Sequence, residues 1–170
     1  MAPLPRGYTP PVVPVSAVLI AQNEEKTIGD ALASVAFCDE IVVVDSGSTD
    51  GTREVAAAAG ARVIVNAPWP GFTAQRDFAT RAARHDWVLA LDADERVGAP
   101  LREEIQALRA EGFAPAGYRI PRVAWYLGRW VRATDWYPDW QVRLFDRTRG
   151  AWQGDLVHAP FAGRGPVGRL

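Results

Sequence analysis

Short apolar runs alternate with amphipathic segments over residues 15–111. The runs are rich in Val, Ile and Leu and have strand length: Val15–Ala21, Ile41–Val44, Arg62–Val65 and Trp87–Leu91. The segments between and after them place apolar residues at helical spacing: Glu25–Val35, Thr52–Ala59, Thr73–Arg84 and Pro100–Glu111. Apolar strands without polar alternation are typical of parallel sheets that helices cover on both faces. The pattern therefore predicts an α/β fold, Rossmann-like, with a mostly parallel sheet flanked by helices.

Residues 117–170 lack this alternation. Tyr118–Val123 and Gln141–Phe145 have the composition of strands, whereas Trp125–Trp140 is aromatic, basic and rich in turn residues. The last ten residues contain no recognisable helix or cap. We therefore expect a short, mixed, aromatic-rich part after the parallel sheet, and a native chain that continues beyond Leu170.

The composition fits one globular domain. The chain has 170 residues, of which 48% are hydrophobic and 23% charged, so disorder and small disulfide scaffolds are excluded. Cys38 is the single cysteine and cannot form an internal disulfide. No basic region followed by an apolar stretch opens the chain, and its longest apolar stretch, Val12–Ala21, is too short to span a bilayer. These features predict a cytoplasmic protein.

Charge is distributed unevenly along the chain. Residues 1–116 hold 10 Lys and Arg against 16 Asp and Glu, whereas residues 117–170 hold 9 against 4. Five of the seven Trp also lie in the second part. An acidic front and a basic, aromatic back indicate two different surfaces on one fold, although Arg on a solvated face with Trp as core filler remains an alternative.

Polar residues follow three of the expected strands directly. Gln22–Glu24 come after the first strand, Asp45 and Ser46 after the second, and Asp92–Glu95 after the fourth. Carboxyl ends of parallel strands lie along one edge of a sheet, where ligands bind at the switch point of strand order. The sequence therefore predicts a ligand site with several carboxylates at this edge. The simpler interpretation is ordinary loop polarity, with Asp50 as a helix cap.

The fourth strand ends in Asp92-Ala93-Asp94, two carboxylates one residue apart. Hard carboxylate oxygens suit Mg²⁺ or Mn²⁺, and these ions leave coordination positions for phosphate oxygens. The glycine-rich loops of P-loop proteins and dinucleotide-binding enzymes, GxxxxGK[ST] and GxGxxG, are missing after the first strand. The pattern therefore favours a divalent metal as the carrier of a diphosphate.

Together these segments resemble the inverting family 2 glycosyltransferases of the GT-A fold. The resemblance rests on AQNEE at 21–25, VDSGSTDGT at 44–52 and LDADE at 91–95, and covers roughly residues 15–160. A narrower similarity, to lipopolysaccharide core β-glucosyltransferases, rests on GFTAQR at 71–76, WYPDWQVRLF at 136–145 and Val157-His158. The family resemblance implies a single GT-A domain over 1–170, with a nucleotide-sugar half at about 15–116 and an acceptor half at 117–170.

The resemblance also implies a nucleotide-binding role for four residues near the first two strands. Asp45 would accept a hydrogen bond from the N3–H group of uracil, which a carboxylate suits. Ala21 and Asn23 would line the base and ribose, with Glu24 nearby.

The diphosphate and the metal would fall to other residues. Asp92 would touch the ribose or the metal, Asp94 would bind the metal, and His158 would complete its shell. Arg76 would neutralise part of the diphosphate charge through its forked donors, unless it is an ordinary surface arginine. Family members often carry Asn directly after this arginine, whereas Asp77 stands here. A histidine hydrogen-bonded to backbone is the alternative for His158.

Inversion requires a general base on the acceptor side, and Asp139 is the best candidate. It lies between Trp136 and Trp140, where partial desolvation would raise the pKa of a carboxyl, while Arg132 or Arg143 nearby would oppose that rise. A Pro-Asp turn without a catalytic role is the alternative, and Asp135 is the second choice.

The resulting hypothesis is a transferase that moves a hexose, with glucose expected, from a UDP-sugar to a saccharide or lipid-linked saccharide of the bacterial envelope. It would use Mg²⁺ or Mn²⁺, would not bind nucleic acid, and would touch the inner membrane peripherally through its basic segment. A metal-dependent nucleotidyltransferase is disfavoured, because Lys26 is the only lysine and no glycine-rich activating loop is present. A truncated or inactive sugar-nucleotide-binding module remains an alternative.

Overall fold

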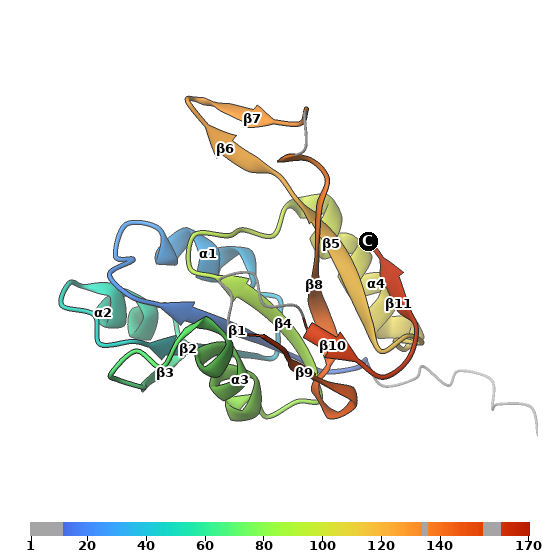
Figure 1. Cartoon of the computed structure of the whole chain (residues 1–170), viewed down its shortest axis with the longest axis horizontal. Helices are drawn as coiled ribbons and strands as arrows, with labels where there is room; N and C mark the ends of the chain where they lie inside the picture. Colours follow the sequence, from blue (N-terminus) through green and yellow to red (C-terminus); the bar gives the residue numbers. More distant parts are fainter. Residues whose placement is uncertain (1–11, 134–135, 155–160) are drawn as a thin grey trace, which may run out of the picture.

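A seven-stranded sheet forms the centre of the protein in the computed structural model, which describes residues 12–133, 136–154 and 161–170. The strand order is β11-β5-β8-β4-β1-β2-β3 (Figure 1). The four strands at one side are parallel: β1 (Val15–Ala21), β2 (Glu40–Asp45), β3 (Arg62–Val65) and β4 (Trp87–Asp92). The α/β fold with a mostly parallel sheet is confirmed.

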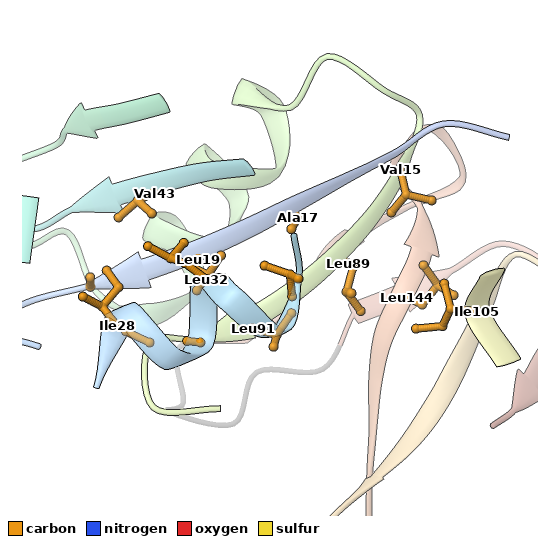
Figure 2. Close-up of a cluster of buried hydrophobic side chains, with 14 of the residues drawn as sticks. Val15, Ala17, Leu19, Ile28, Leu32, Val43, Leu89, Leu91, Ile105 and Leu144 are labelled. Carbon is orange, nitrogen blue, oxygen red and sulfur yellow. The ribbon is translucent and has the colours of Figure 1, made fainter. Parts of the chain in front are cut away.

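Helices cover both faces of this parallel part, as the continuous apolar strands predict. They are α1 (Ile28–Ser34), α2 (Thr52–Ala58), α3 (Phe72–Ala82) and α4 (Ala99–Glu111). Alternate residues of β1 divide between two buried clusters: Leu19 belongs to the cluster that includes Ile28 of α1 and Ile105 of α4, whereas Ile20 belongs to the cluster that includes Ala79 of α3. Figure 2 shows the first of these clusters, with the side chains of α1 directed at the sheet.

The expected helix from Glu25 begins only at Ile28. The preceding residues are held by the loop after β2: the Glu24 amide donates to the Thr52 hydroxyl at 2.8 Å, and the Glu25 amide donates to Asp50 at 3.2 Å. These bonds hold the chain in a turn and delay the helix by about one turn relative to the sequence pattern.

The remaining strands of the main sheet add a mixed edge to it. They are β5 (Gly117–Arg122), β8 (Asp139–Asp146) and β11 (Val167–Arg169). Strand β8 runs antiparallel to both of its neighbours, pairing Leu144 with Leu89 of β4 and Asp139 with Arg122 of β5. This reversal carries Asp139 to the edge of the sheet where β4 ends.

Four short strands form two small hairpins outside the main sheet. One pairs β9 (Gly150–Trp152) with β10 (Phe161–Gly163), and the other pairs β6 (Ala124–Tyr126) with β7 (Arg129–Val131). A 3₁₀ turn, η2 (Arg147–Arg149), connects β8 to β9. The sequence pattern indicated none of the strands β6, β7, β9, β10 and β11. Figure 1 shows the β6–β7 hairpin standing away from the body of the molecule.

Within the described ranges, no helix has the length and apolar character that a membrane span requires.

Candidate active site

The carboxyl ends of β1, β2 and β4 meet at one edge of the sheet. Parallel pairing sets Ala21 opposite Asp45, and Ile20 opposite Asp92. The amide of Ser46 donates to the carbonyl of Ala21 at 2.9 Å, which joins the first two strand ends. The structure thus brings together Ala21, Asp45 and Asp92, as the strand pattern predicts.

Asp45 organises the loop that follows β2. Its carboxylate is fully buried, and Oδ1 accepts hydrogen bonds from the amides of Gly47 at 3.1 Å and Ser48 at 3.0 Å. The Ser48 hydroxyl donates to Oδ2. Gly47 has a φ of +88°, a conformation that glycine adopts without strain. Besides its predicted contact with uracil, Asp45 therefore has a structural role that the sequence did not indicate.

Asn23 and Glu24 connect the loop after β1 to the loop after β2. The amide of Asn23 donates to the Ser48 hydroxyl at 2.9 Å, and its side-chain Oδ1 accepts from the Thr49 amide at 2.8 Å. The Glu24 carboxylate accepts from the Thr27 hydroxyl at 2.5 Å. Both side chains therefore take part in the architecture of the loops that flank the expected base site.

Gln75 connects α3 to the loop after β2, a role that the sequence pattern did not predict. It lies in the first turn of α3, is fully buried, and donates from Nε2 to the Ser46 hydroxyl at 2.9 Å. Its Oε1 accepts from Asn66 Nδ2 at 2.6 Å. Because a buried amide needs such partners, Gln75 fixes α3 against the loop after β2 and so sets the position of its neighbour Arg76.

Arg76 and Arg143 converge on Asp92. Arg76 Nη2 lies 2.8 Å from Asp92 Oδ1 and 3.1 Å from Oδ2, while Arg143 Nη2 lies 2.9 Å from Oδ2. Both arginine side chains are more than nine-tenths buried. Burial alone would raise the pKa of Asp92, but the charges of Arg143 and Arg76 outweigh it and hold that pKa below its usual range. Arg76 is therefore buried beside Asp92 rather than an ordinary surface arginine, and its role toward a diphosphate stays a prediction.

Glu95 extends this arrangement. Its Oε1 accepts from Arg143 Nη2 at 2.6 Å and from Arg122 Nη1 at 2.9 Å, and its Oε2 accepts from the Asp92 amide at 3.1 Å. Glu95 belongs to the LDADE motif, but the sequence pattern predicted no role for it. The available signal was its position three residues after Asp92, the spacing at which a side chain reaches back across a turn.

Asp139 is held from two sides. Arg122 donates to Oδ2 from Nε at 2.9 Å and from Nη2 at 2.5 Å, and Gln141 Nε2 donates to Oδ1 at 2.6 Å. The expected cationic neighbours were Arg132 or Arg143, whereas Arg122 makes the contact because strand register sets the two residues opposite each other. Burial lowers the pKa of Arg122, but the hydrogen bonds that Arg122 donates to Glu95 and Asp139, together with their negative charges, outweigh burial and raise it.

Three arginines and three carboxylates thus alternate across the site. We call this set the ion chain: Arg76, Asp92, Arg143, Glu95, Arg122 and Asp139. It connects the metal-binding candidates after β4 with the candidate base on β8. Arg143 Nε, in the middle of the chain, is buried and has no hydrogen-bond partner among the described residues. Orphaned buried donors are uncommon, and this one suits an anionic ligand.

Asp94 is the carboxylate best placed to take a metal ion. It is exposed and forms no ion pair or hydrogen bond within the described ranges, whereas both oxygens of Asp92 receive arginine donors. The described residues contain no cluster of three His, Cys, Asp or Glu side chains that could hold an ion by themselves. Because Mg²⁺ and Mn²⁺ commonly bind one or two carboxylates plus phosphate oxygens, Asp94 fits such an ion. His158 and Asp135 lie outside the described residues.

Comparison with known proteins gives concordant matches. Residues 16–165 match the model of glycosyl transferase family 2. The chain is 34% identical over 163 residues to the lipopolysaccharide core biosynthesis glycosyltransferase LpsC of Rhizobium meliloti, an alignment that covers 93% of this chain and 60% of LpsC. The chain therefore spans less than two thirds of the length of that relative.

Solved structures agree with these matches. Glucosyl-3-phosphoglycerate synthase of Mycobacterium tuberculosis, in complex with Mn²⁺, UDP and glucosyl-3-phosphoglycerate, superposes with a TM-score of 0.52 at 28% identity, covering 64% of this chain and 43% of that one. TarS of S. aureus superposes with a TM-score of 0.59 at 22% identity, covering 86% and 43%, which shows a shared fold.

Proposed function

Because this chain belongs to glycosyl transferase family 2, we propose that it transfers a hexose, with glucose as the expected sugar, from a UDP-sugar to a hydroxyl of an envelope saccharide such as the lipopolysaccharide core. The observation that carries the proposal is the ion chain, which connects Asp92 at the end of β4 with Asp139 on β8. The relatives support it, since LpsC is named for lipopolysaccharide core biosynthesis and a structural neighbour was solved with UDP and Mn²⁺. Family membership sets aside the nucleotidyltransferase alternative.

The nucleotide would bind along the ends of β1 and β2. The Asp45 carboxylate accepts three hydrogen bonds from its own loop. A carboxylate can accept about four hydrogen bonds, so one acceptor position remains for uracil N3–H. Ala21 and Asn23 would line the base and ribose from the adjacent loop, with Glu24 holding that loop in place.

The diphosphate would lie near the buried arginines. Arg76 and Arg143 bring two fixed positive charges to the end of β4, and Arg143 Nε is a donor with no acceptor among the described residues. A phosphate oxygen would satisfy it. Asp94, with Asp92 and His158, would hold a divalent ion, whose charge stabilises the UDP leaving group when it is bound.

On the acceptor side, Asp139 would remove the proton from the attacking hydroxyl. Arg122 and Gln141 hold its carboxylate in one orientation, which is what an in-line attack with inversion requires. Its side chain is 36% exposed, so an acceptor hydroxyl can approach it.

Calorimetric titration with UDP tests the donor assignment. We expect the Asp45→Asn variant to bind UDP roughly 10- to 100-fold more weakly in the presence of Mn²⁺, since a hydrogen bond to a charged group contributes about 1.5–3 kcal/mol. The amide oxygen of Asn can still accept from Gly47 and Ser48, so the loop should remain folded. Wild-type protein should also bind N3-methyl-UDP weakly, whereas the variant should hardly distinguish it from UDP.

The matched control is Asp30→Asn, an exposed carboxylate of α1 that pairs with Arg96. It should bind UDP as the wild type does. Equal affinity of wild type and Asp45→Asn for UDP would show that Asp45 serves the loop alone.

A further inference from the structure

An exposed aromatic surface covers the hairpin formed by β6 and β7. We define the aromatic hairpin as residues 124–131, in which Trp125 is 59% exposed, Leu127 83% and Trp130 56%. Including its neighbours Trp136 and Tyr137, the stretch 125–137 holds six of the eleven large exposed apolar residues of the described chain. Single exposed apolar residues are normal, but a cluster of this size on one projection marks an interaction surface.

The rings of this surface are ordered by one another. Trp125 pairs directly with Trp130 across the hairpin, with ring centroids 4.9 Å apart and the planes nearly perpendicular. Tyr126 contacts Trp136 in a similar edge arrangement at 5.6 Å. Neither pair belongs to the two buried cores. The aromatic surface is therefore prearranged while remaining exposed to solvent.

The tip of the hairpin places an aliphatic side chain at its most exposed point. Leu127 and Gly128 form the two-residue turn, with φ values of +48° and +79°. Such turns favour Asn, Asp or Gly at the first position, because other L-residues cost roughly 1–2 kcal/mol in this conformation. Leu127 lacks the conformational preference for this turn and belongs to neither buried cluster of the described residues, so packing within them does not account for its apolar side chain.

The aromatic hairpin has one charged residue, Arg129, and a second cation, Arg132, follows it in the sequence. Arg129 lies opposite Tyr126 and Arg132 follows β7, while residues 123–133 contain no Asp or Glu. Both arginines are exposed, and neither forms an ion pair within the described ranges. They are therefore available for anionic groups.

We propose that the aromatic hairpin inserts into the interfacial layer of a bilayer that contains anionic phospholipid. Trp and Tyr favour this layer because each combines an apolar ring with a polar edge, Leu127 would reach the acyl boundary, and Arg129 and Arg132 would bind headgroup phosphates. A saccharide is the alternative ligand, because sugar rings can stack on exposed aromatic rings. It would not account for Leu127, since an exposed leucine at the tip offers a saccharide no hydrogen bond.

The hairpin would also orient the active site toward the membrane. Strand β6 begins two residues after Arg122, and the chain returns to the sheet at Asp139. The aromatic hairpin is therefore connected to the sheet next to Arg122 and Asp139, the pair at the acceptor end of the ion chain. The inference does not depend on sugar transfer, because membrane binding and UDP binding are measured separately.

Flotation of the full chain with phospholipid vesicles at low ionic strength tests the proposal. Wild-type protein should float with vesicles containing 30% phosphatidylglycerol, and much less with pure phosphatidylcholine. Leu127→Asn supplies a residue that the turn prefers, so the hairpin should be retained while vesicle binding falls roughly tenfold through loss of apolar burial. Arg129→Gln and Arg132→Gln should each weaken binding about fivefold and reduce its dependence on anionic lipid.

Matched controls remove the same groups elsewhere on the surface. Phe78 on α3 and Arg102 on α4 are exposed and lie outside the aromatic hairpin. The variants Phe78→Gln and Arg102→Gln should therefore bind vesicles as the wild type does. Circular dichroism of the paired Trp125 and Trp130 rings, and unchanged affinity for UDP, would show that Leu127→Asn keeps both the hairpin and the donor site.

Three outcomes would overturn the proposal: wild-type protein that fails to float with anionic vesicles, equal flotation with neutral and anionic vesicles, or a Leu127→Asn variant with an intact hairpin that floats as well as the wild type. Saturable binding of a soluble saccharide by the hairpin without vesicle binding would also contradict it.

Discussion

Replacing Asp139 with Asn should lower kcat by about a thousandfold while the Kd for UDP-glucose stays within about twofold of the wild-type value, because a general base contributes roughly 10²–10⁴ to the rate. Asn accepts a proton poorly but keeps the size of the side chain. Arg122 would lose its ion pair with this residue and keep its contact with Glu95, so the strand should remain in place. Initial rates of UDP release, together with calorimetric affinity, measure the two effects.

Asp146→Asn is the matched control, since it makes the same change at the other end of β8. Asp146 caps a 3₁₀ turn by accepting from Thr148 and lies far from the ion chain in the strand. Its loss should cost about 1 kcal/mol of stability and leave turnover intact. A parallel loss of donor affinity and turnover in Asp139→Asn would instead identify Asp139 as a structural residue, and full activity would end its assignment as the base.

The second large effect is expected at Asp94. The Asp94→Asn variant should lose the Mn²⁺-dependent part of its UDP affinity, because a neutral amide replaces a carboxylate that, unlike Asp92 and Glu95, pairs with no arginine among the described residues. Direct titration with Mn²⁺ in the presence of UDP, followed by electron paramagnetic resonance of free Mn²⁺, gives a readout that is independent of catalysis. Binding of the ion by the wild type should exceed that by the variant by at least about tenfold.

Asp86→Asn serves as the control at the opposite end of β4, where an exposed carboxylate faces Arg147. It should retain normal Mn²⁺ and UDP binding. If Asp94→Asn keeps metal-dependent affinity, the ion is held elsewhere, and Asp94 has no part in the site.

The parallel part of the fold and the position of the site could be predicted from the sequence because both depend on local signals. Continuous apolar runs identified β1, β2 and β4, and the polar residues that follow them had to meet wherever parallel strands end together. The positions of Asp45 and Asp92 at this edge were predicted in this way. The structural role of Asp45 was not, because its three hydrogen bonds depend on the exact path of the following loop.

The ion chain could not be predicted, since its pairs join residues far apart in sequence. Arg143 reaches Asp92 across 51 positions, and Arg122 faces Asp139 only through the antiparallel register of β5 and β8. Proximity along the chain suggested Arg132 or Arg143 for Asp139, whereas the strand pairing brings Arg122 to it, a residue that the sequence pattern did not suggest. The β6–β7 hairpin was missed for a different reason: its Leu-Gly turn lacks the Asn-Gly or Asp-Gly signal that identifies such hairpins.

We propose that the edge of the sheet after β1, β2 and β4 supports transfer of a sugar from UDP. Release of UDP from UDP-glucose, measured with and without Mn²⁺ and with and without a lipopolysaccharide core acceptor, tests it most directly. The structure and family membership lead us to expect release that requires both the ion and the acceptor, with a product of inverted anomeric configuration. Tight binding of UDP without release under any of these conditions would contradict the claim and identify the chain as a sugar-nucleotide-binding module.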